Sequence, residues 1–207
     1  MQLKIIEPHQ RWQFSRAMME MHHHRKQIFV DRLGWDLPNK GSWLEVDEFD
    51  NEYCVYLLAR APDGSHRASL RLLPSNRPHM LGSVFRELCA APPPVGEDVW
   101  EISRLVSRPE GSMGTSMLRA HRLLALALVE FALCNGIGRY SLVTESLRLP
   151  ALLSVGWDVA PLGLPTMLGG EQLQALEIRI DADTLPAMRE RFGIAESVLR
   201  LNGEGSC

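Results

Sequence analysis

The stretch Trp100-Glu101-Ile102-Ser103-Arg104 (WEISR) is the most informative segment of this 207-residue chain. It lies inside the run 99–106, whose length and composition predict a buried central strand. A charge taken out of water is costly unless it is paired, so Glu101 and Arg104 need a partner or a substrate. On a regular strand Glu101 and Ser103 share one face and Arg104 points to the other. Two interpretations are open: a β-bulge redirects one side chain, or Arg104 serves a network on the far face.

Further charged residues on the N-terminal side of this strand interrupt apolar or aromatic surroundings. For any one of them a structural ion pair is a sufficient explanation. Because several occur together, the sequence predicts that they converge on one polar cleft. These residues are Arg25, Asp47, Asp50 and Arg71.

The order of predicted elements favours the α/β class. A strand over 3–6 precedes one or two helices within 9–33, and a Pro-Asp-Gly-Ser turn joins strands at 53–60 and 68–73. After the strand 99–106, a long helix over 116–134 ends at Asn135-Gly136, a typical C-terminal cap. The remaining predicted elements are short helices over 85–89, 146–153 and 185–191, and strands over 140–144, 157–160 and 175–180.

This order indicates a mixed sheet with helices on both sides, a three-layer α/β/α sandwich of the acetyltransferase type. The length fits one domain over 1–207, which begins with a helical region at about 9–50. The segment from about 193 onward is expected to be a flexible tail.

Composition and charge narrow the classes of function. A net charge of −3 gives no electrostatic case for binding nucleic acid. No signal peptide is visible, and the apolar run 123–133 is too short to span a bilayer. We therefore expect a soluble, cytoplasmic protein with no nucleic-acid or membrane partner. The four cysteines have no paired spacing, which argues against a zinc site and against a disulfide framework; they are Cys54, Cys89, Cys134 and Cys207.

A run of three histidines at 22–24 invites a metal-binding interpretation. Consecutive residues on a helix point about 100° apart, so these side chains do not converge on one ion. A solvated or partly packed run is favoured, and no metal partner is predicted.

With these positions identified, the chain resembles the acyl-homoserine lactone synthases, the LuxI-type autoinducer synthases. Known members join the acyl group of an acyl thioester to the amine of S-adenosylmethionine, and lactonisation then releases methylthioadenosine and the carrier thiol. The resemblance thus implies an acyltransferase that makes a quorum-sensing signal, and its fold favours the β-bulge. It covers nearly the whole chain and rests on Arg25-x-x-x-Phe29 with Trp35, on 45–50 (EVDEFD), 71–74 (RLLP), 78–81 (PHML), WEISR, 142–144 (LVT) and 156–157 (GW).

The resemblance places Arg25, Phe29 and Trp35 in the substrate-binding region for S-adenosylmethionine, and we add Arg32. Aromatic faces suit a sulfonium cation and an adenine ring, and arginine forks suit a carboxylate. Packing of the two aromatic residues in an ordinary core is the alternative.

Glu101 is the predicted general base. The α-amine must be neutral to attack a thioester carbonyl, although most of it is protonated near pH 7, and a carboxylate within reach can take that proton. In the family, acids that match Asp47 and Asp50 join arginines in a network that shapes the cleft. Arg71 and Arg104 are the matching counter-ions here, and their expected role is orientation more than bond-making.

Ser103, Leu105 and Thr144 are the predicted residues for the acyl chain or the pantetheine arm. Ser103 and Thr144 offer short hydroxyl groups, and Thr144 matches a position associated in the family with 3-oxo or 3-hydroxy chains. Leu105 stands where the family usually carries an aromatic residue, which indicates a change in pocket shape.

The acyl carrier is either an acyl carrier protein or coenzyme A, and no cofactor is predicted. Four arginines are either a docking surface for an acidic carrier or ordinary surface charges. They are Arg119, Arg122, Arg139 and Arg148.

Two other functions are open. A plain N-acyltransferase would use acyl-coenzyme A on another amine and would not need the set Arg25, Phe29 and Trp35. A ligand sensor without activity would be favoured by the loss of Glu101, Arg104 or Asp47, and all three are present.

Overall fold

The computed structural model describes residues 1–37, 41–108 and 115–199. Its described part forms a mixed sheet in the order β1-β2-β3-β4-β5-β8-β6, with β7 paired to β8. Strands β4 and β5 run parallel, whereas the other paired strands run antiparallel. The strands are β1 Gln2–Ile6, β2 Val55–Arg60, β3 His66–Pro74, β4 Val99–Ser107, β5 Arg139–Glu145, β6 Asp158–Pro161, β7 Thr166–Leu168 and β8 Glu171–Arg179.

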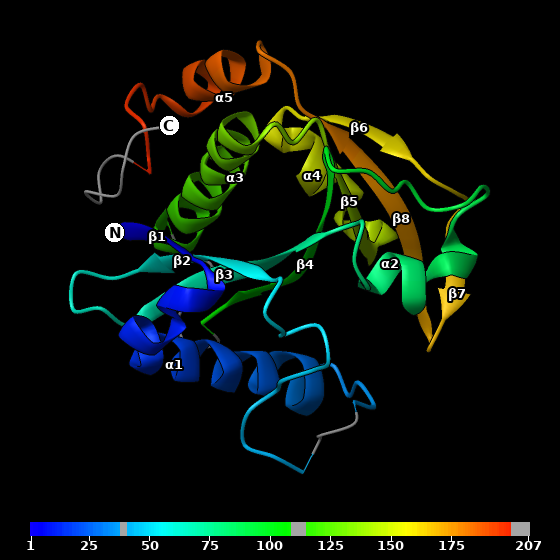
Figure 1. The fold of residues 1–207 in the computed structure, drawn as a ribbon, viewed down its shortest axis with the longest axis horizontal. Coiled ribbons are helices and arrows are strands. Elements are labelled where there is room, and N and C mark those ends of the chain that lie inside the picture. The colour runs from blue at the N-terminus through cyan, green and yellow to red at the C-terminus, as the bar shows by residue number, and fades with distance from the viewer. Residues whose placement is uncertain (38–40, 109–114, 200–207) are drawn as a thin grey trace.

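Helices cover both faces of this sheet, which confirms the predicted three-layer arrangement (Figure 1). In the view of Figure 1, α3 lies above strands β2 and β3, and α1 lies below them. The helices are α1 Ser15–Arg25, α2 Met80–Ser83, α3 Thr115–Asn135, α4 Leu149–Val155 and α5 Thr184–Phe192. Shorter 3₁₀ segments occupy Pro8–Phe14, Arg86–Leu88 and Ser146–Arg148, and a π-helix follows α1 over Lys26–Arg32.

Strand β2 illustrates why both faces of the sheet are apolar. Successive residues of a strand point to opposite faces. Leu57 and Ala59 join the hydrophobic cluster that includes α3, whereas Tyr56 and Leu58 join the cluster that includes α1. All four are fully buried, so a continuous apolar run here indicates a strand covered on both sides.

A β-bulge interrupts the pairing of β3 with β4. Ser69 pairs with Val106 and Arg71 pairs with Ser103, so one residue of β3 faces two residues of β4, Arg104 and Leu105. Arg104 has φ +52°, in the left-handed region. The extra residue turns Arg104 to the face that already carries Arg71 and Ser103. The first of the two sequence interpretations is therefore confirmed.

One face of the sheet carries a polar row beneath α2. Glu101 of β4 pairs with Ser141 of β5, and Ser141 pairs with Glu177 of β8. Paired residues on neighbouring strands project to the same side of a sheet. The pairing of β4 with β5 ends at Ile102, so the strands part just beyond Glu101.

Strand β7 was not predicted, because three residues between Pro165 and Gly169 are too few to show alternation. The helix expected over 85–89 is a single 3₁₀ turn over Arg86–Leu88, and α2, which precedes it, was not predicted. Cys54 and Cys89 are free thiols, as expected, whereas Cys134 is disulfide-bonded, which corrects the expectation for that residue.

The prediction of a flexible tail from 193 is wrong for the residues up to 199. Val198 is buried, and the backbone N–H groups of Val198 and Leu199 each donate to the Glu130 carboxylate at 3.1 Å. Glu130 lies on the buried side of α3 and also receives Arg189 at 2.9 Å. A buried carboxylate that needs donors thus holds this segment in place.

Candidate active site

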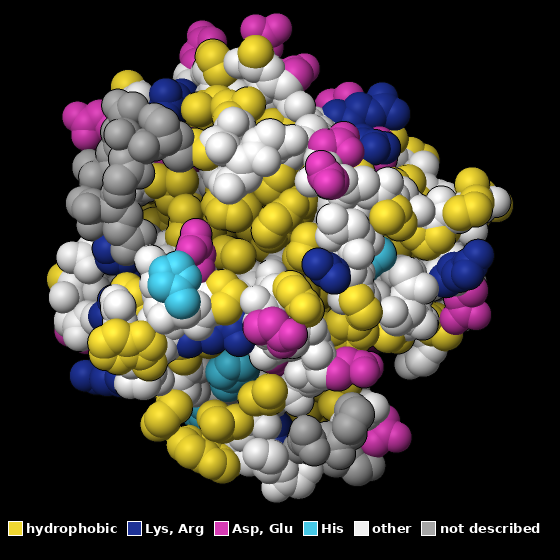
Figure 2. All heavy atoms as spheres, viewed as in Figure 1, with side chains coloured by type: hydrophobic (Ala, Val, Ile, Leu, Met, Phe, Trp, Pro, Cys, Tyr) yellow, Lys and Arg dark blue, Asp and Glu magenta, His cyan; other side chains and the backbone are white. Residues whose placement is uncertain are grey.

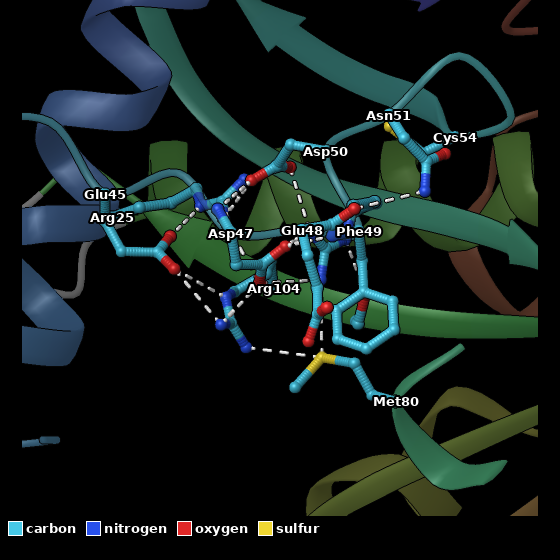
Figure 3. A network of polar contacts seen from close by, with 12 residues as sticks. Arg25, Glu45, Asp47, Glu48, Phe49, Asp50, Asn51, Cys54, Met80 and Arg104 are labelled. Atoms are coloured by element: carbon cyan, nitrogen blue, oxygen red, sulfur yellow. Dashed lines mark hydrogen bonds and ion pairs between the residues drawn. The ribbon is translucent and has the colours of Figure 1, made fainter. Parts of the chain in front are cut away.

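Six charged side chains from four parts of the chain meet beside β4 (Figure 3). Three carboxylates come from the segment 45–50, which follows the π-helix in the chain, and three guanidinium groups come from α1, β3 and β4. Their formal charges cancel, which is the condition under which a buried cluster of this size is tolerable. The six residues are Arg25, Glu45, Asp47, Asp50, Arg71 and Arg104.

Arg25, at the end of α1, uses its whole guanidinium fork. Its Nη1 and Nη2 donate to Asp50 Oδ1 and Oδ2 at 2.8 and 2.9 Å, and its Nε donates to Glu45. A bidentate arginine–carboxylate pair fixes orientation as well as charge. Because Arg25 is 1% exposed, this pair locks the acidic segment onto α1.

Arg71 of β3 links the acidic segment to the sheet. Its Nη1 donates to Asp50 Oδ1 at 2.8 Å and also to Asp47, and its Nη2 donates to Asp47 Oδ2 at 3.1 Å. Its Nε donates to Ser103 Oγ at 3.1 Å, so Ser103 is engaged by the network. Arg71 is fully buried, as its prediction as a counter-ion requires.

Arg104 of β4 joins the charged network to an aromatic pair. Its Nη2 lies 2.6 Å from Asp47 Oδ2 and 3.1 Å from Glu45 Oε1. The guanidinium carbon lies 5.4 Å from the ring centroid of Phe29 and 5.8 Å from that of Trp35. These two rings are stacked, with centroids 4.7 Å apart and planes inclined by 16°. The five residues therefore form one continuous set of charged groups and aromatic faces.

The π-helix explains how Phe29 and Trp35 meet although they are six residues apart. Its wider turns give hydrogen bonds such as Leu33 N–H to Ile28 O at 3.0 Å, and Trp35 N–H then donates to Phe29 O at 2.9 Å. Phe29 is buried, whereas Trp35 is half-buried. Their contact agrees both with a shared site wall and with ordinary packing, so the shared wall stays a prediction. Arg32 is exposed at the end of the same π-helix and takes part in none of the ion pairs among the described residues.

The electrostatic environment keeps the network ionised. Burial raises the pKa of Asp50, but Arg25 and Arg71 outweigh burial and hold that pKa well below its usual range. Burial lowers the pKa of the Arg25 guanidinium, and the attraction of Asp50 and Glu45 raises it above its ordinary value. For Arg104, burial prevails and the pKa is lowered, although Glu45 and Asp47 oppose the change.

Glu101 stands beside this network and has a different set of partners. Its carboxylate accepts the backbone N–H groups of Met80 at 2.8 Å and of Leu81 at 2.7 Å, and so caps the N-terminus of α2. Glu101 is 1% exposed. Burial raises its pKa, and the two hydrogen bonds, together with the charges of His79 and Arg71, partly oppose that rise.

The three histidines at 22–24 have three different partners, which lie in two segments, consistent with their divergence on a helix. His22 Nδ1 lies 2.8 Å from Glu45 O, and Glu45 N–H donates to His22 O at 3.1 Å. His23 Nδ1 lies 3.1 Å from Trp43 O. His24 Nδ1 lies 2.7 Å from His66 Nδ1 on β3. The run therefore fixes the acidic segment and β3 against α1.

Sequence reasoning missed the roles of Glu45 and Tyr56. Glu45 bridges Arg25 and Arg104, and Tyr56 Oη donates to Asp50 Oδ1 at 2.7 Å. A signal for Glu45 was present, because it lies two residues before Asp47 in the motif EVDEFD. Tyr56 gave no such signal, since an aromatic residue in a strand is ordinary packing.

The predicted acyl-chain residues lie at the place where β4 and β5 part. Ser103 is half-buried, and Leu105, the second residue of the bulge, is 53% exposed. Thr144 is half-buried on β5, where it pairs with Gln174 of β8. These three residues border the opening of the sheet, but none of them joins the ion pairs.

Comparison with known proteins places the chain in a family. A profile of the autoinducer synthase family matches residues 10–188. An acyl-homoserine-lactone synthase from Ralstonia nicotianae is 35% identical over 170 residues, which cover 80% of this chain and 83% of the relative. An isovaleryl-homoserine lactone synthase from Bradyrhizobium diazoefficiens is 32% identical over 181 residues, covering 84% and 78%.

Solved structures agree with the sequence relatives. BjaI, a CoA-dependent acyl-homoserine lactone synthase solved with SAM and isopentyl-CoA, aligns with a TM-score of 0.86 and 28% identity over 95% of this chain and 91% of that one. TofI, solved with an inhibitor and MTA, aligns with a TM-score of 0.75 and 30% identity over 91% and 96%. The fold and these relatives together define an acyltransferase with an acetyltransferase-like fold. The chain belongs to the autoinducer synthase family, which confirms the resemblance in its motifs.

Proposed function

We propose that this cleft transfers an acyl group from an acyl thioester to the α-amine of S-adenosylmethionine, and that lactonisation then releases methylthioadenosine and the carrier thiol. The observation that carries the proposal is the convergence of Arg25, Arg71 and Arg104 on one acidic segment beside the stacked pair of Phe29 and Trp35. Membership of a family whose curated relatives are acyl-homoserine-lactone synthases supports the same reaction.

In this proposal the aromatic pair and the network receive S-adenosylmethionine. The sulfonium and the adenine ring would lie against Phe29 and Trp35, where an aromatic face attracts a cation by about 0.5–2 kcal/mol. Arg25 and Arg104 would hold the acidic segment in place, and Arg32, on the exposed end of the π-helix, would approach the ligand from outside. The side chains of the network hold one another in place through their ion pairs, so the site is preorganised.

Glu101 is proposed as the general base. Its pKa is raised by burial, which brings it closer to that of the amine from which it takes a proton. Ser103, Leu105 and Thr144 are proposed to border the acyl chain where β4 and β5 part. The reaction as written calls for no cofactor or metal, and both substrates belong to cytoplasmic metabolism, which is where we place the enzyme.

We further propose coenzyme A as the acyl carrier. BjaI and MesI, both CoA-dependent, align with TM-scores of 0.86 and 0.84, compared with 0.75 for TofI. The alternative of an acidic carrier protein needs a basic docking surface. Arg139 is paired with Glu177, and Arg148 with Glu145. On the face shown in Figure 2, the Lys and Arg side chains are scattered and do not form one continuous patch.

The test is an assay of the purified protein with S-adenosylmethionine and a panel of branched, straight, 3-oxo and aromatic acyl groups, each on coenzyme A and on a carrier protein. Methylthioadenosine and lactone are measured by mass spectrometry. We expect both products from at least one coenzyme A thioester. If no thioester gives both, the proposal fails, and an acylated amine without methylthioadenosine would favour the plain N-acyltransferase.

A further inference from the structure

Two buried polar atoms around Glu101 have no hydrogen-bond partner among the described residues. They are Oγ of Ser141, on β5, and Nε2 of His79, the residue before α2. Ser141 is 0% exposed and His79 is 4% exposed. Protein interiors rarely leave polar atoms unpaired, so two of them around one carboxylate need a chemical explanation.

Ser141 lies directly beside Glu101 across the parallel pairing of β4 and β5. Neighbouring strands are about 4.8 Å apart, and paired residues project to the same face, so the hydroxyl group and the carboxylate share one layer. On the other side of Ser141, β8 places Glu177, whose carboxylate is paired with Arg139 at 3.5 Å and with Arg179 at 3.2 Å. Ser141 is therefore free to serve Glu101.

The tautomer of His79 follows from its one hydrogen bond. Its Nδ1 lies 2.8 Å from the carbonyl oxygen of Arg77, which can only accept, so Nδ1 carries the hydrogen. In the neutral ring Nε2 then holds a lone pair and is an acceptor. The ring packs tightly against Gly82 of α2, where an added Cβ would lie 2.9 Å from Nε2. The unpaired acceptor is thus fixed in position.

Glu101 needs such acceptors in one of its two states. As a carboxylate it accepts, and the N–H groups of Met80 and Leu81 satisfy it. After it takes a proton it gains an O–H group, which must donate. At 1% exposure it has no direct access to bulk water for this purpose.

We propose that Ser141 and His79 are positioning residues that supply the acceptors for the protonated form of Glu101; the inference rests on the proposed function. Glu101 takes one proton from the substrate ammonium, so one N–H bond breaks and one O–H bond forms, and that O–H group donates to this pair. The neutral amine then attacks the thioester carbonyl, so that a C–N bond forms and the C–S bond breaks. The proton held by Glu101 passes to the departing thiolate, which becomes the thiol, and the second proton of the nitrogen leaves to solvent.

This arrangement acts in the same direction as burial, which already raises the pKa of Glu101. Arg71 from β3 lowers the pKa of Glu101, and His79 lowers it as well while its ring is charged. His79 acts as an acceptor only with its ring neutral, and β5 presents the neutral Ser141. Acceptors that stabilise the protonated form raise the pKa further and make the carboxylate a stronger base.

The experiment is the pH dependence of kcat/KM for matched variants. Ser141→Ala removes one acceptor, and Ser141→Thr keeps it. His79→Asn keeps a donor near the position of Nδ1 and loses the acceptor, whereas His79→Gln places an amide oxygen near the position of Nε2. For the variants that lose an acceptor we expect the acidic limb to move to lower pH by about one unit and the plateau to fall by roughly 3- to 10-fold. The other two variants should retain most of the wild-type profile.

Profiles of Ser141→Ala and His79→Asn that overlay the wild type, at normal lactone synthesis, would overturn the inference. Ser69→Ala is the control, because Ser69 is equally buried on β3 but bonds to His66 at 2.9 Å; it should lose stability without a shift in the profile. If either Ser141→Ala or His79→Asn does not fold, the pH profile of the other still tests the inference. A wild-type protein that makes no lactone would instead contradict the proposed function. In that case the pKa of Glu101 is measured from its infrared carboxyl band, which the Glu101→Gln variant identifies. We expect that pKa to be lower in Ser141→Ala and in His79→Asn than in the wild type, and an unchanged pKa would overturn the inference.

Discussion

Asp50 is the most heavily shared carboxylate of the cleft. It accepts from Arg25, Arg71 and the hydroxyl group of Tyr56, and it also accepts the backbone N–H of Asp47 at 2.8 Å. A single side chain thereby joins α1, β2, β3 and the acidic segment. Because two buried guanidinium groups depend on it, its charge cannot be removed without leaving them uncompensated.

We predict that Asp50→Asn destabilises the protein by about 3–5 kcal/mol, the usual cost of breaking a buried ion pair from one side. The free energy of unfolding is measured with urea. The control is Asp158→Asn, because Asp158 is 67% exposed in its side chain and lies 3.8 Å from Arg179. That change should cost less than about 1 kcal/mol. Equal losses of unfolding free energy in the two variants would show that Asp50 is no more important for stability than an exposed carboxylate.

Glu101→Gln is expected to lower turnover by about 10²–10⁴-fold, because an amide cannot take the proton of the amine. The structure adds a second effect. One end of the amide would present N–H groups to the backbone N–H of Met80 or Leu81, which removes a hydrogen bond. The melting temperature of the variant and its affinity for S-adenosylmethionine must therefore be measured together with its rate. Full activity in this variant would remove the base assignment.

At the scale of elements, two irregularities build the site. The bulge in β4 turns Arg104 inward, and the π-helix brings Phe29 against Trp35. Each costs some regular hydrogen bonding, and each sets one wall of the cleft. Regular versions of the same elements would leave Arg104 on the α3 face of the sheet and would turn Phe29 relative to Trp35.

Trp35→Ala should weaken binding of S-adenosylmethionine by roughly 10-fold, because it removes one face of the stacked pair and a cation–π contact. Trp35 is half-buried, so the fold should survive. Calorimetric titration gives the affinity and differential scanning fluorimetry gives the melting temperature. Trp12→Ala, at a tryptophan that is 75% exposed, is the matched control. A lower melting temperature with unchanged affinity would assign Trp35 to the core.

The regular elements could be predicted from sequence because their signals are local. The continuous apolar run of β2 and the cap at Asn135-Gly136 each depend on a few neighbouring residues. The irregular elements could not be derived in the same way. An inserted residue in β4 leaves the two-residue period of the strand unchanged on either side of it. The choice between a β-bulge and a separate network for Arg104 therefore depended on the resemblance to the family. The π-helix has a composition that an α-helix would also accept.

At the scale of the whole molecule, buried histidines connect the layers. His66 of β3 is fully buried, meets His24 of α1 and lies 2.9 Å from Ser69 through Nε2. Burial, followed by the charges of His24 and Arg108, lowers the pKa of His66 to about 3. Burial and Arg25 likewise lower the pKa of His22. Both side chains are therefore held neutral at their contacts.

We predict that acid destabilises the protein well above the pH at which carboxylates titrate. A lowered histidine pKa contributes stability that is fully present above the unfolded value of about 6.5 and is lost as pH falls, for His66 down to about 3. Each proton taken up on unfolding should cost about 1.4 kcal/mol per pH unit.

Urea unfolding at pH 7.5, 6 and 5 measures this dependence. His66→Gln should flatten it, whereas His9→Gln should not, because the side chain of His9 is 71% exposed. A free energy of unfolding that stays constant from pH 7.5 to 5 would contradict the role of the buried histidines.

Long-range contacts explain what sequence could not give for the site. The convergence of Arg25, Asp47, Asp50 and Arg71 was foreseen from charge in apolar surroundings, and the structure brings all four together. The bridging of two arginines by Glu45 and the unpaired atoms of His79 and Ser141 depend on packing between distant segments. The motif at 45–50 marks Glu45 but not its two partners, and no local pattern predicts the unpaired atoms.

The left-handed backbone at Arg104 sets a rule for natural variation. A residue with a Cβ loses roughly 1 kcal/mol of stability in that conformation, and the guanidinium contacts with Glu45, Asp47 and the two aromatic rings offset the penalty. Lineages that have abandoned the reaction should therefore drift to glycine or asparagine here, and not to alanine or leucine. The residue at this position would then distinguish inactive homologues from active enzymes.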